Sequence, residues 1–257
     1  MAKIKFVTGH PASIVTTSRG KRVMTISDIH IGLEYELRSY GFNLPSQTTK
    51  ILERLEHLLK KVKPDLLVIL GDVKHAIAKY TRKIRRDVET LLKMLIDIGV
   101  EVKVVLGNHD GSLKVDQDLV SLEPPSGTVI DDVGFIHGHA WPRREVLVAE
   151  LIVMGHLHPS LPQALGGQRV WVSYILGKKS RERVAKVLKS EVNIKRLIVH
   201  PAFNEFLGAG GLSEESFSKL SPLFRRCLDP SKGYVYTLNG VFIGRFSTLS
   251  SSSTPSF

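Results

Sequence analysis

The chain has 257 residues, 42% hydrophobic and 24% charged, a composition typical of a globular protein with a sizeable core. Its 36 Lys and Arg against 25 Asp and Glu give a net charge of +11, which favours polyanionic partners such as nucleic acid, unless the whole proteome of its source is basic. A single cysteine, Cys227, excludes an internal disulfide and a thiolate metal cluster.

Neither a membrane span nor a secretory signal is predicted. No apolar run approaches the roughly 20 residues that cross a bilayer. The basic start of the chain, residues 1–6, has neither an apolar core nor a small-residue cleavage site after it. We therefore expect no contact with membranes and a cytoplasmic location.

The first half of the chain alternates between strand and helix patterns. Apolar residues at three- and four-residue spacing predict two helices, at 51–62 and 81–98. Four β-like or continuously apolar runs predict strands, at 12–17, 22–27, 65–70 and 102–106. This alternation predicts an α/β fold with a parallel sheet.

After residue 110 the alternation loosens. Residues 111–127 are predicted to form a loop over short structure, and Asn239-Gly240 is predicted to turn a hairpin. Further strands are predicted at 129–130, 133–136, 151–154, 170–175, 197–199, 234–238 and 241–243. We expect residues 1–246 to form a single domain and the Ser- and Thr-rich residues 247–257 to be a disordered tail.

Polar motifs follow five of these predicted strands directly. Ligands collect at the C-terminal ends of strands in α/β sheets, and the glycines allow a close approach of the backbone. The motifs are Asp28-Ile29-His30, Gly71-Asp72, Gly107-Asn108-His109-Asp110, His137-Gly138-His139 and Gly155-His156-Leu157-His158. Of the histidines outside this series, His10, His57 and His200 are expected to be ordinary core or surface residues.

Seven side chains of these motifs have the chemistry of metal ligands. They are Asp28, His30, Asp72, Asn108, His137, His156 and His158. Carboxylate, amide and imidazole ligands without thiolate suit Mn²⁺, the ion we expect, and also Fe²⁺, Zn²⁺ or Ni²⁺. Seven ligands exceed what one ion with an open position needs, so we expect two divalent ions bridged by Asp72. Such a pair activates water and stabilises both oxygens of a phosphoester displacement.

Each of these motifs resembles a signature motif of the calcineurin-like metallophosphoesterase superfamily, and together they span residues 28–158. The resemblance implies a four-layer α/β/β/α sandwich and hydrolysis of phosphoesters by a hydroxide that bridges the metals. His109, backed by Asp110, resembles the family histidine that contacts the phosphate and protonates the leaving oxygen. The implied ligand sets are Asp28, His30, Asp72 and His158 for one ion, and Asp72, Asn108, His137 and His156 for the other.

A histidine three residues after Asp72 extends this resemblance. His75 is similar to the histidine that helps to orient the phosphate in double-strand-break-repair nucleases, and the chain most resembles archaeal SbcD-related phosphoesterases. We expect it to lack the DNA-capping domain and the ATPase-binding tail of the true repair nucleases. The resemblance therefore leaves an ATPase partner open.

Two further residues are predicted to bind substrate. They are Lys74, at the start of the basic segment 74–86, and His139. A second basic segment covers 178–196, and either segment also fits a solvated helix face. The leading hypothesis is a phosphodiesterase or nuclease acting on DNA or RNA. The alternatives are an enzyme acting on nucleotides or other small phosphoesters, and a non-catalytic interaction scaffold with the same fold.

Overall fold

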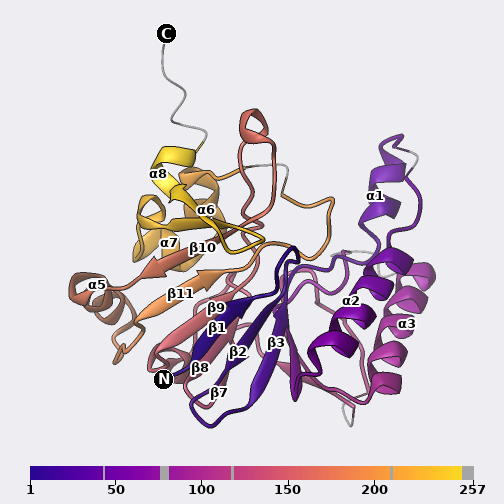
Figure 1. Cartoon of the computed structure of the whole chain (residues 1–257), viewed down its shortest axis with the longest axis horizontal. Helices are drawn as coiled ribbons and strands as arrows, with labels where there is room; N and C mark the ends of the chain where they lie inside the picture. The colour runs from indigo at the N-terminus through magenta and orange to yellow at the C-terminus, as the bar shows by residue number, and fades with distance from the viewer. Residues whose placement is uncertain (43, 76–80, 117–118, 209–210, 251–257) are drawn as a thin grey trace.

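The computed structural model describes residues 1–42, 44–75, 81–116, 119–208 and 211–250 (Figure 1). Six strands form the first sheet in the order in which they occur in the chain. The first three pair antiparallel and the rest pair parallel. They are β1 (Lys3–Phe6), β2 (Ser13–Thr16), β3 (Arg22–Ile26), β4 (Leu66–Ile69), β5 (Glu101–Val105) and β6 (Val120–Glu123).

Seven strands form the second sheet, in the order β13-β12-β10-β11-β9-β8-β7. At its centre β9 pairs parallel with both β8 and β11, and the outer pairs are antiparallel. The strands are β7 (Thr128–Ile130), β8 (Val133–Ile136), β9 (Leu151–Met154), β10 (Val170–Ile175), β11 (Arg196–Val199), β12 (Tyr234–Thr237) and β13 (Phe242–Arg245).

Helices cover the outer faces of the two sheets. In Figure 1, α2 and α3 lie on the right of the sheets, and α5 to α8 lie on the left. The α-helices are α1 (Leu33–Ser39), α2 (Thr48–Val62), α3 (Arg82–Ile98), α4 (Arg144–Leu147), α5 (Lys178–Leu188), α6 (Glu214–Leu220), α7 (Pro222–Arg226) and α8 (Phe246–Leu249). This arrangement confirms the predicted four-layer α/β/β/α sandwich.

The continuously apolar strands are explained by burial on both faces. In β4, Leu66 and Val68 join the apolar cluster between the two sheets, whereas Leu67 and Ile69 join the cluster beneath α2 and α3. Side chains of a strand alternate between its faces, so a strand covered on both sides must be apolar throughout. Phe6 of the first sheet stacks on Trp171 of the second, with ring centroids 4.1 Å apart.

The two long helices end where the sequence predicts, and α3 begins within one residue of its predicted start, whereas α2 begins three residues earlier than predicted. Thr81 caps α3 because its hydroxyl accepts a hydrogen bond from the amide of Ile84, at 3.3 Å. Gly99 ends α3 with a left-handed φ of 75°. Helix α2 ends at Val62, two residues before Pro64, because the residue before a proline disfavours the helical conformation.

Several short elements differ from the prediction. Strand β6 lies within 111–127, which was predicted to form a loop over short structure, and β1, α1, α4 and α6 were not predicted. The expected tail from residue 247 includes residues 247–249 of α8, and the buried ring of Phe246 anchors this helix. Residues 251–257 lie outside the described residues. Among the helices that are described, none is long and apolar enough to cross a membrane.

Candidate metal centre

The seven predicted ligands meet at one edge of the sandwich. Those of the first sheet follow β3, β4 and β5, and those of the second follow β8 and β9. Six of them form two groups, and the donor atoms within each group lie within 4.8 Å of one another. One group is Asp28, His30 and His158, and the other is Asp72, His137 and His156. The C-terminal ends of parallel strands from both sheets therefore build the site.

Asp72 lies between the two groups. Its Oδ2 atom is 3.2 Å from Nε2 of His30 and 3.3 Å from Nε2 of His137. Asn108 joins the second group, because its Oδ1 atom is 3.2 Å from the same nitrogen of His137. One carboxylate oxygen thus faces an imidazole of each group.

Buried polar atoms without hydrogen-bond partners mark the first group. Within the described part of the chain, Oδ1 of Asp28 and Nε2 of His30 and His158 have no such partner. The Asp28 oxygen and the His158 nitrogen are 3.1 Å apart. Leaving such atoms unpaired is costly, and a cation would satisfy them. The oxygen and nitrogen donors of both groups fit borderline divalent ions.

Five of the seven ligands have a left-handed backbone, which is uncommon for residues other than glycine. Hydrogen bonds between loops hold this conformation: the amide of Asp28 donates to the carbonyl of Gly71 at 3.1 Å, and that of His30 to the carbonyl of Asp72 at 2.8 Å. Such conformations cluster at functional sites. The φ angles are 55° at Asp28, 47° at His30, 52° at Asp72, 73° at His156 and 42° at His158.

Two glycines allow the ligand loops to approach one another. A Cβ atom at Gly107 would lie 2.1 Å from Oδ1 of Asp72, and one at Gly71 would lie 2.3 Å from Nδ1 of His137. No side chain fits at such distances. The predicted close approach of the backbone is confirmed at both positions.

The two buried aspartates and their histidine partners stabilise each other's charges. Burial alone would raise the pKa of Asp72, but the imidazoles of His137 and His30 beside its carboxylate hold it well below its usual range. Burial alone would lower the pKa of His137, yet Asp72 and Asp28 raise it to about 9. Burial, followed by the charge of His137, lowers the pKa of His156 to about 3. His156 is therefore a neutral imidazole, the form that binds metals.

Among the described residues, Asp110 makes no hydrogen bond to the imidazole of His109, which differs from the prediction. Its buried carboxylate accepts backbone hydrogen bonds from Asp72 at 2.7 Å and from Val73 and Gly107 at 2.9 Å. Nδ1 of His109 lies instead 2.7 Å from the carbonyl of His75. Asp110 therefore holds two ligand loops together, and a backbone carbonyl orients His109.

Lys74 also has surroundings that differ from the prediction. The residue is fully buried, and its ammonium group donates to the carbonyl of His109. The amide of His109 donates to Oδ1 of Asp72 at 2.9 Å. Lys74 therefore supports the loop that carries His109, whereas the sequence predicted a contact with substrate.

Two more predicted residues lie beside the ligands. Nδ1 of His75 is 2.9 Å from Nδ1 of His30, and its Nε2 is 2.9 Å from a carboxylate oxygen of Glu36. Both ring nitrogens of His75 thus have partners within the protein, so the expected phosphate contact lacks a free nitrogen. The ring of His139 lies 5.2 Å from that of His137, next to the second group.

Sequence reasoning missed a supporting segment after β11. The amide of Phe203 donates to the carbonyl of Ser27 at 2.7 Å, and the side-chain amide of the buried Asn204 donates to the carbonyl of Ile29 at 2.9 Å. These bonds fix the loop that carries Asp28. No periodicity or motif in the sequence marks this segment. Glu36, on the short helix α1, was missed for the same reason.

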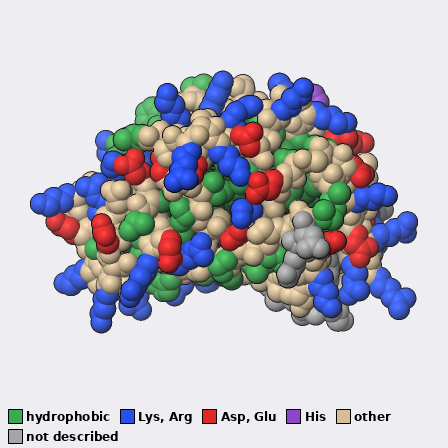
Figure 2. Space-filling view, turned by 90° about the horizontal axis from the view of Figure 1, so that it is seen from below, with side chains coloured by type: hydrophobic (Ala, Val, Ile, Leu, Met, Phe, Trp, Pro, Cys, Tyr) green, Lys and Arg blue, Asp and Glu red, His purple; other side chains and the backbone are tan. Residues whose placement is uncertain are grey.

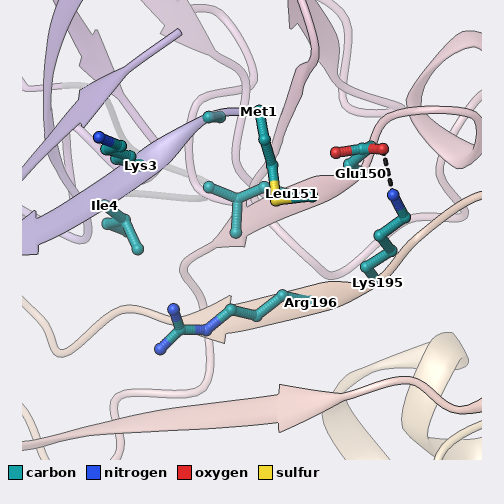
Figure 3. A pocket seen from close by; sticks show the side chains of 8 residues that line it. Met1, Lys3, Ile4, Glu150, Leu151, Lys195 and Arg196 are labelled. Atoms are coloured by element: carbon teal, nitrogen blue, oxygen red, sulfur yellow. Dashed lines mark hydrogen bonds and ion pairs between the residues drawn. The ribbon is translucent and has the colours of Figure 1, made fainter. Parts of the chain in front are cut away.

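A separate hollow of about 440 Å³ lies between the start of β1 and strands β9 and β11 (Figure 3). In it Lys195 pairs with Glu150, while Arg196 extends beside Leu151. None of its lining residues belongs to the predicted site. Figure 2 shows the molecule from below the view of Figure 1, and there Lys and Arg are spread among Asp and Glu rather than gathered into one stripe.

Comparison with known proteins agrees with this fold. The profile of the calcineurin-like phosphoesterase family matches residues 21–197. The chain therefore belongs to the calcineurin-like phosphoesterase family, a class of hydrolases that act on phosphoester bonds with the aid of divalent metal ions.

Three individual proteins are similar to the chain. A Pyrococcus horikoshii protein named thermosome subunit is 31% identical over 131 residues, which are 51% of this chain and 21% of that protein. The chain thus spans about a fifth of that relative. The crystal structure of Pseudomonas putida nuclease MPE has a TM-score of 0.53 at 18% identity, covering 92% of this chain and 98% of that one. The structure of the E. coli phosphoesterase Yfce has a TM-score of 0.41 at 18% identity, covering 87% of this chain and 97% of that one.

Proposed function

We propose that residues 1–246 form a single domain that acts as a dinuclear metal-dependent phosphoesterase. The observation that carries this proposal is the position of Asp72, whose Oδ2 atom lies 3.2 Å from His30 and 3.3 Å from His137. A carboxylate between two groups of ligands suits a bridge between two cations. A non-catalytic scaffold would need no such arrangement of buried ligands.

The two ligand groups define what each ion would bind. Asp28, His30 and His158, with Asp72, would hold one, and His137, His156 and Asn108, with Asp72, would hold the other. Bound divalent ions lower the pKa of water and stabilise the negative charge that develops on a phosphoryl group. The donor atoms favour Mn²⁺, with Fe²⁺, Zn²⁺ and Ni²⁺ as alternatives.

The residues around His109 prepare it to act as an acid. The carbonyl of His75 can only accept, so Nδ1 of His109 carries a proton. When a second proton is bound at Nε2, the imidazolium can deliver that proton to the leaving oxygen and return to the neutral imidazole. Lys74 holds the backbone carbonyl of His109 and Asp72 holds its amide. The carbonyl of His75 therefore orients the imidazole, and Lys74 and Asp72 hold the backbone that carries it.

We further propose that the substrate is a phosphodiester of DNA or RNA. The net charge of +11 supports a polyanionic substrate, and His75 supports a relation to archaeal SbcD-related phosphoesterases. The fold is also that of a protein described as a nuclease. Nucleotides and other small phosphoesters are the alternative substrates.

Hydrolysis by single variants tests the reaction. Asp72→Asn should lose at least about 1,000-fold in kcat because it weakens the bridge, and His109→Asn about 100-fold or more because the acid is lost. His57→Asn, an exposed site on α2, is the matched control and should retain wild-type activity. Activity towards aryl mono- and diesters is measured with Mn²⁺ and with chelator. Full activity of a folded Asp72→Asn protein would disprove the mechanism.

A substrate panel separates the two substrate classes. Single- and double-stranded DNA, RNA and cyclic nucleotides are compared with the aryl esters under the same conditions. If nucleic acid is the substrate, it should be cleaved, and its affinity should fall steeply with added salt. Hydrolysis of the small esters alone, without binding of nucleic acid at low salt, would establish the alternative.

A further inference from the structure

Helix α1 places a carboxylate against the metal centre. This helix projects from the body of the molecule at the upper right of Figure 1. Its Glu36 lies 2.9 Å from Nε2 of His75, and Nδ1 of His75 lies 2.9 Å from Nδ1 of His30. Nε2 of His30 faces Asp72 at 3.2 Å. Glu36, His75 and His30 thus form a chain that ends at the first ligand group.

The acceptor and donor capacities of these groups determine where the protons lie. If Nε2 of His30 binds a cation, its proton is on Nδ1 and is donated to Nδ1 of His75. Neutral His75 then carries its own proton on Nε2 and donates it to Glu36, whose ionised carboxylate can only accept. Each hydrogen bond has one donor and one acceptor, so the chain is fully satisfied.

Contacts with the neighbouring helices fix the position of Glu36. Gly32 precedes α1 with a φ of 98°, and a Cβ atom there would lie 2.7 Å from Ile84 of α3. The hydroxyl of Tyr35 donates to Asp87 of α3 at 2.6 Å. Glu34 accepts from the amide of Gln47, just before α2, at 3.1 Å. Although its carboxylate is half exposed, Glu36 stands on a helix that is held in place on both sides.

We propose that Glu36 is a positioning residue that acts through His75 to fix the tautomer and orientation of His30 towards its metal ion. The inference rests on the proposed function, since it requires an ion at His30. Carboxylates that hold ligating histidines commonly contribute 10- to 100-fold to metal affinity. Because Glu36 acts through one intervening imidazole, the lower end of this range applies.

Titration of the full chain with Mn²⁺ by calorimetry tests the proposal. Glu36→Gln should weaken one of the two dissociation constants about tenfold and leave the other within about twofold. Glu36→Asp should restore part of the affinity. Glu53→Gln, which removes the same charge from an exposed position on α2, is the matched control and should bind as the wild type does. Circular dichroism establishes that the variants are folded.

A double-mutant cycle shows whether Glu36 acts through His75. In a His75→Phe background the link is broken, so adding Glu36→Gln should have no further effect on either constant. If Glu36→Gln costs a further tenfold there, Glu36 acts by its charge on the whole site, and the proposed route is wrong.

Imidazole tautomers give a readout that is independent of both activity and affinity. In the Zn²⁺-loaded protein, nitrogen NMR should show the proton of His30 on Nδ1 and that of His75 on Nε2, and Glu36→Gln should abolish the fixed tautomer of His75. If the wild type binds no metal, the proposed function fails. If it binds two ions and Glu36→Gln changes neither affinity nor tautomer, only the present inference fails.

Discussion

Individual residues at the metal centre adopt conformations that cost free energy. A left-handed backbone at a residue other than glycine costs on the order of 1 kcal/mol, and Asp28, His30 and Asp72 all have one. Hydrogen bonds from neighbouring loops offset this cost, such as the bond from the amide of His30 to the carbonyl of Asp72. These hydrogen bonds therefore hold the donor atoms of the predicted ligands in place.

A buried histidine outside the centre makes folding sensitive to acid. The ring of His200 lies in the core, 4.3 Å from the ring of Trp171, and its Nε2 is 3.2 Å from the carbonyl of Thr25. Burial lowers the pKa of His200 to about 4, because the core disfavours the charged imidazole. His200 therefore matches the expectation of an ordinary core residue.

The free energy of unfolding should depend on pH through His200. Because the pKa of His200 is lower in the folded than in the unfolded state, stability is lost as the pH falls from about 6.5 to about 4, by up to about 3 kcal/mol. In His200→Leu this contribution disappears, so urea unfolding of the variant should depend less on pH over that window. His57→Asn is the control and should keep the wild-type slope. Equal slopes for His200→Leu and wild type would contradict the assignment.

Among the elements, the long helices carry their own start and stop signals, and the short ones do not. Helix α3 has an N-cap at Thr81 and a glycine at its C-terminal end, Gly99. Strand β6 has only four residues and is held by parallel pairing with β5. Helix α1 has seven residues, too few to show a period. Short elements depend on partners that are distant in sequence.

The N-cap of α3 should contribute measurably to the free energy of unfolding. Thr81→Ala removes the acceptor of the Ile84 amide and should lower the free energy of unfolding by about 1 kcal/mol. Thr90→Ala is the control, because the Thr90 hydroxyl bonds to the carbonyl of Arg86 within the same helix and caps nothing. Chemical denaturation measures both. A loss at Thr90 as large as at Thr81 would show that the cap is not the cause.

At the scale of the whole molecule, the candidate metal centre joins the two sheets. Asp28, from the first sheet, accepts a hydrogen bond at 3.0 Å from the amide of His156, which lies 128 residues further along the chain in the second sheet. Cations at this edge would bind ligands from both sheets. Metal binding should therefore contribute to the stability of the entire sandwich.

The stability of the fold should therefore depend on bound Mn²⁺. Mn²⁺ at about 100 times its Kd should stabilise the fold by about 2.7 kcal/mol, and chelator should then lower Tm by roughly 5–10 °C. Asp72→Asn should lose most of the Mn²⁺-dependent shift, whereas His57→Asn should retain it. Thermal denaturation with and without Mn²⁺ measures the effect. A Tm that changes with neither Mn²⁺ nor chelator would contradict a metal centre between the sheets.

The sequence by itself determined the alternation of strands and helices and the place of the polar motifs at strand ends. Apolar periodicity is a local property, so it predicted α2, α3, β4 and β5, and the hairpin that turns at Asn239-Gly240. The donor types of the motifs also limited the chemistry to divalent metals. These inferences need only residues near one another in the chain.

The tertiary structure decided which atoms of those residues meet. Asp110 accepts backbone amides rather than supporting His109, Lys74 is buried beneath the loop of His109, and Glu36 reaches His75 from a helix that the sequence did not predict. Each contact joins segments that are far apart in the chain or depends on a left-handed backbone. Neither periodicity nor motif spacing records such contacts, because the packing of loops that follow neighbouring strands of the first sheet creates them.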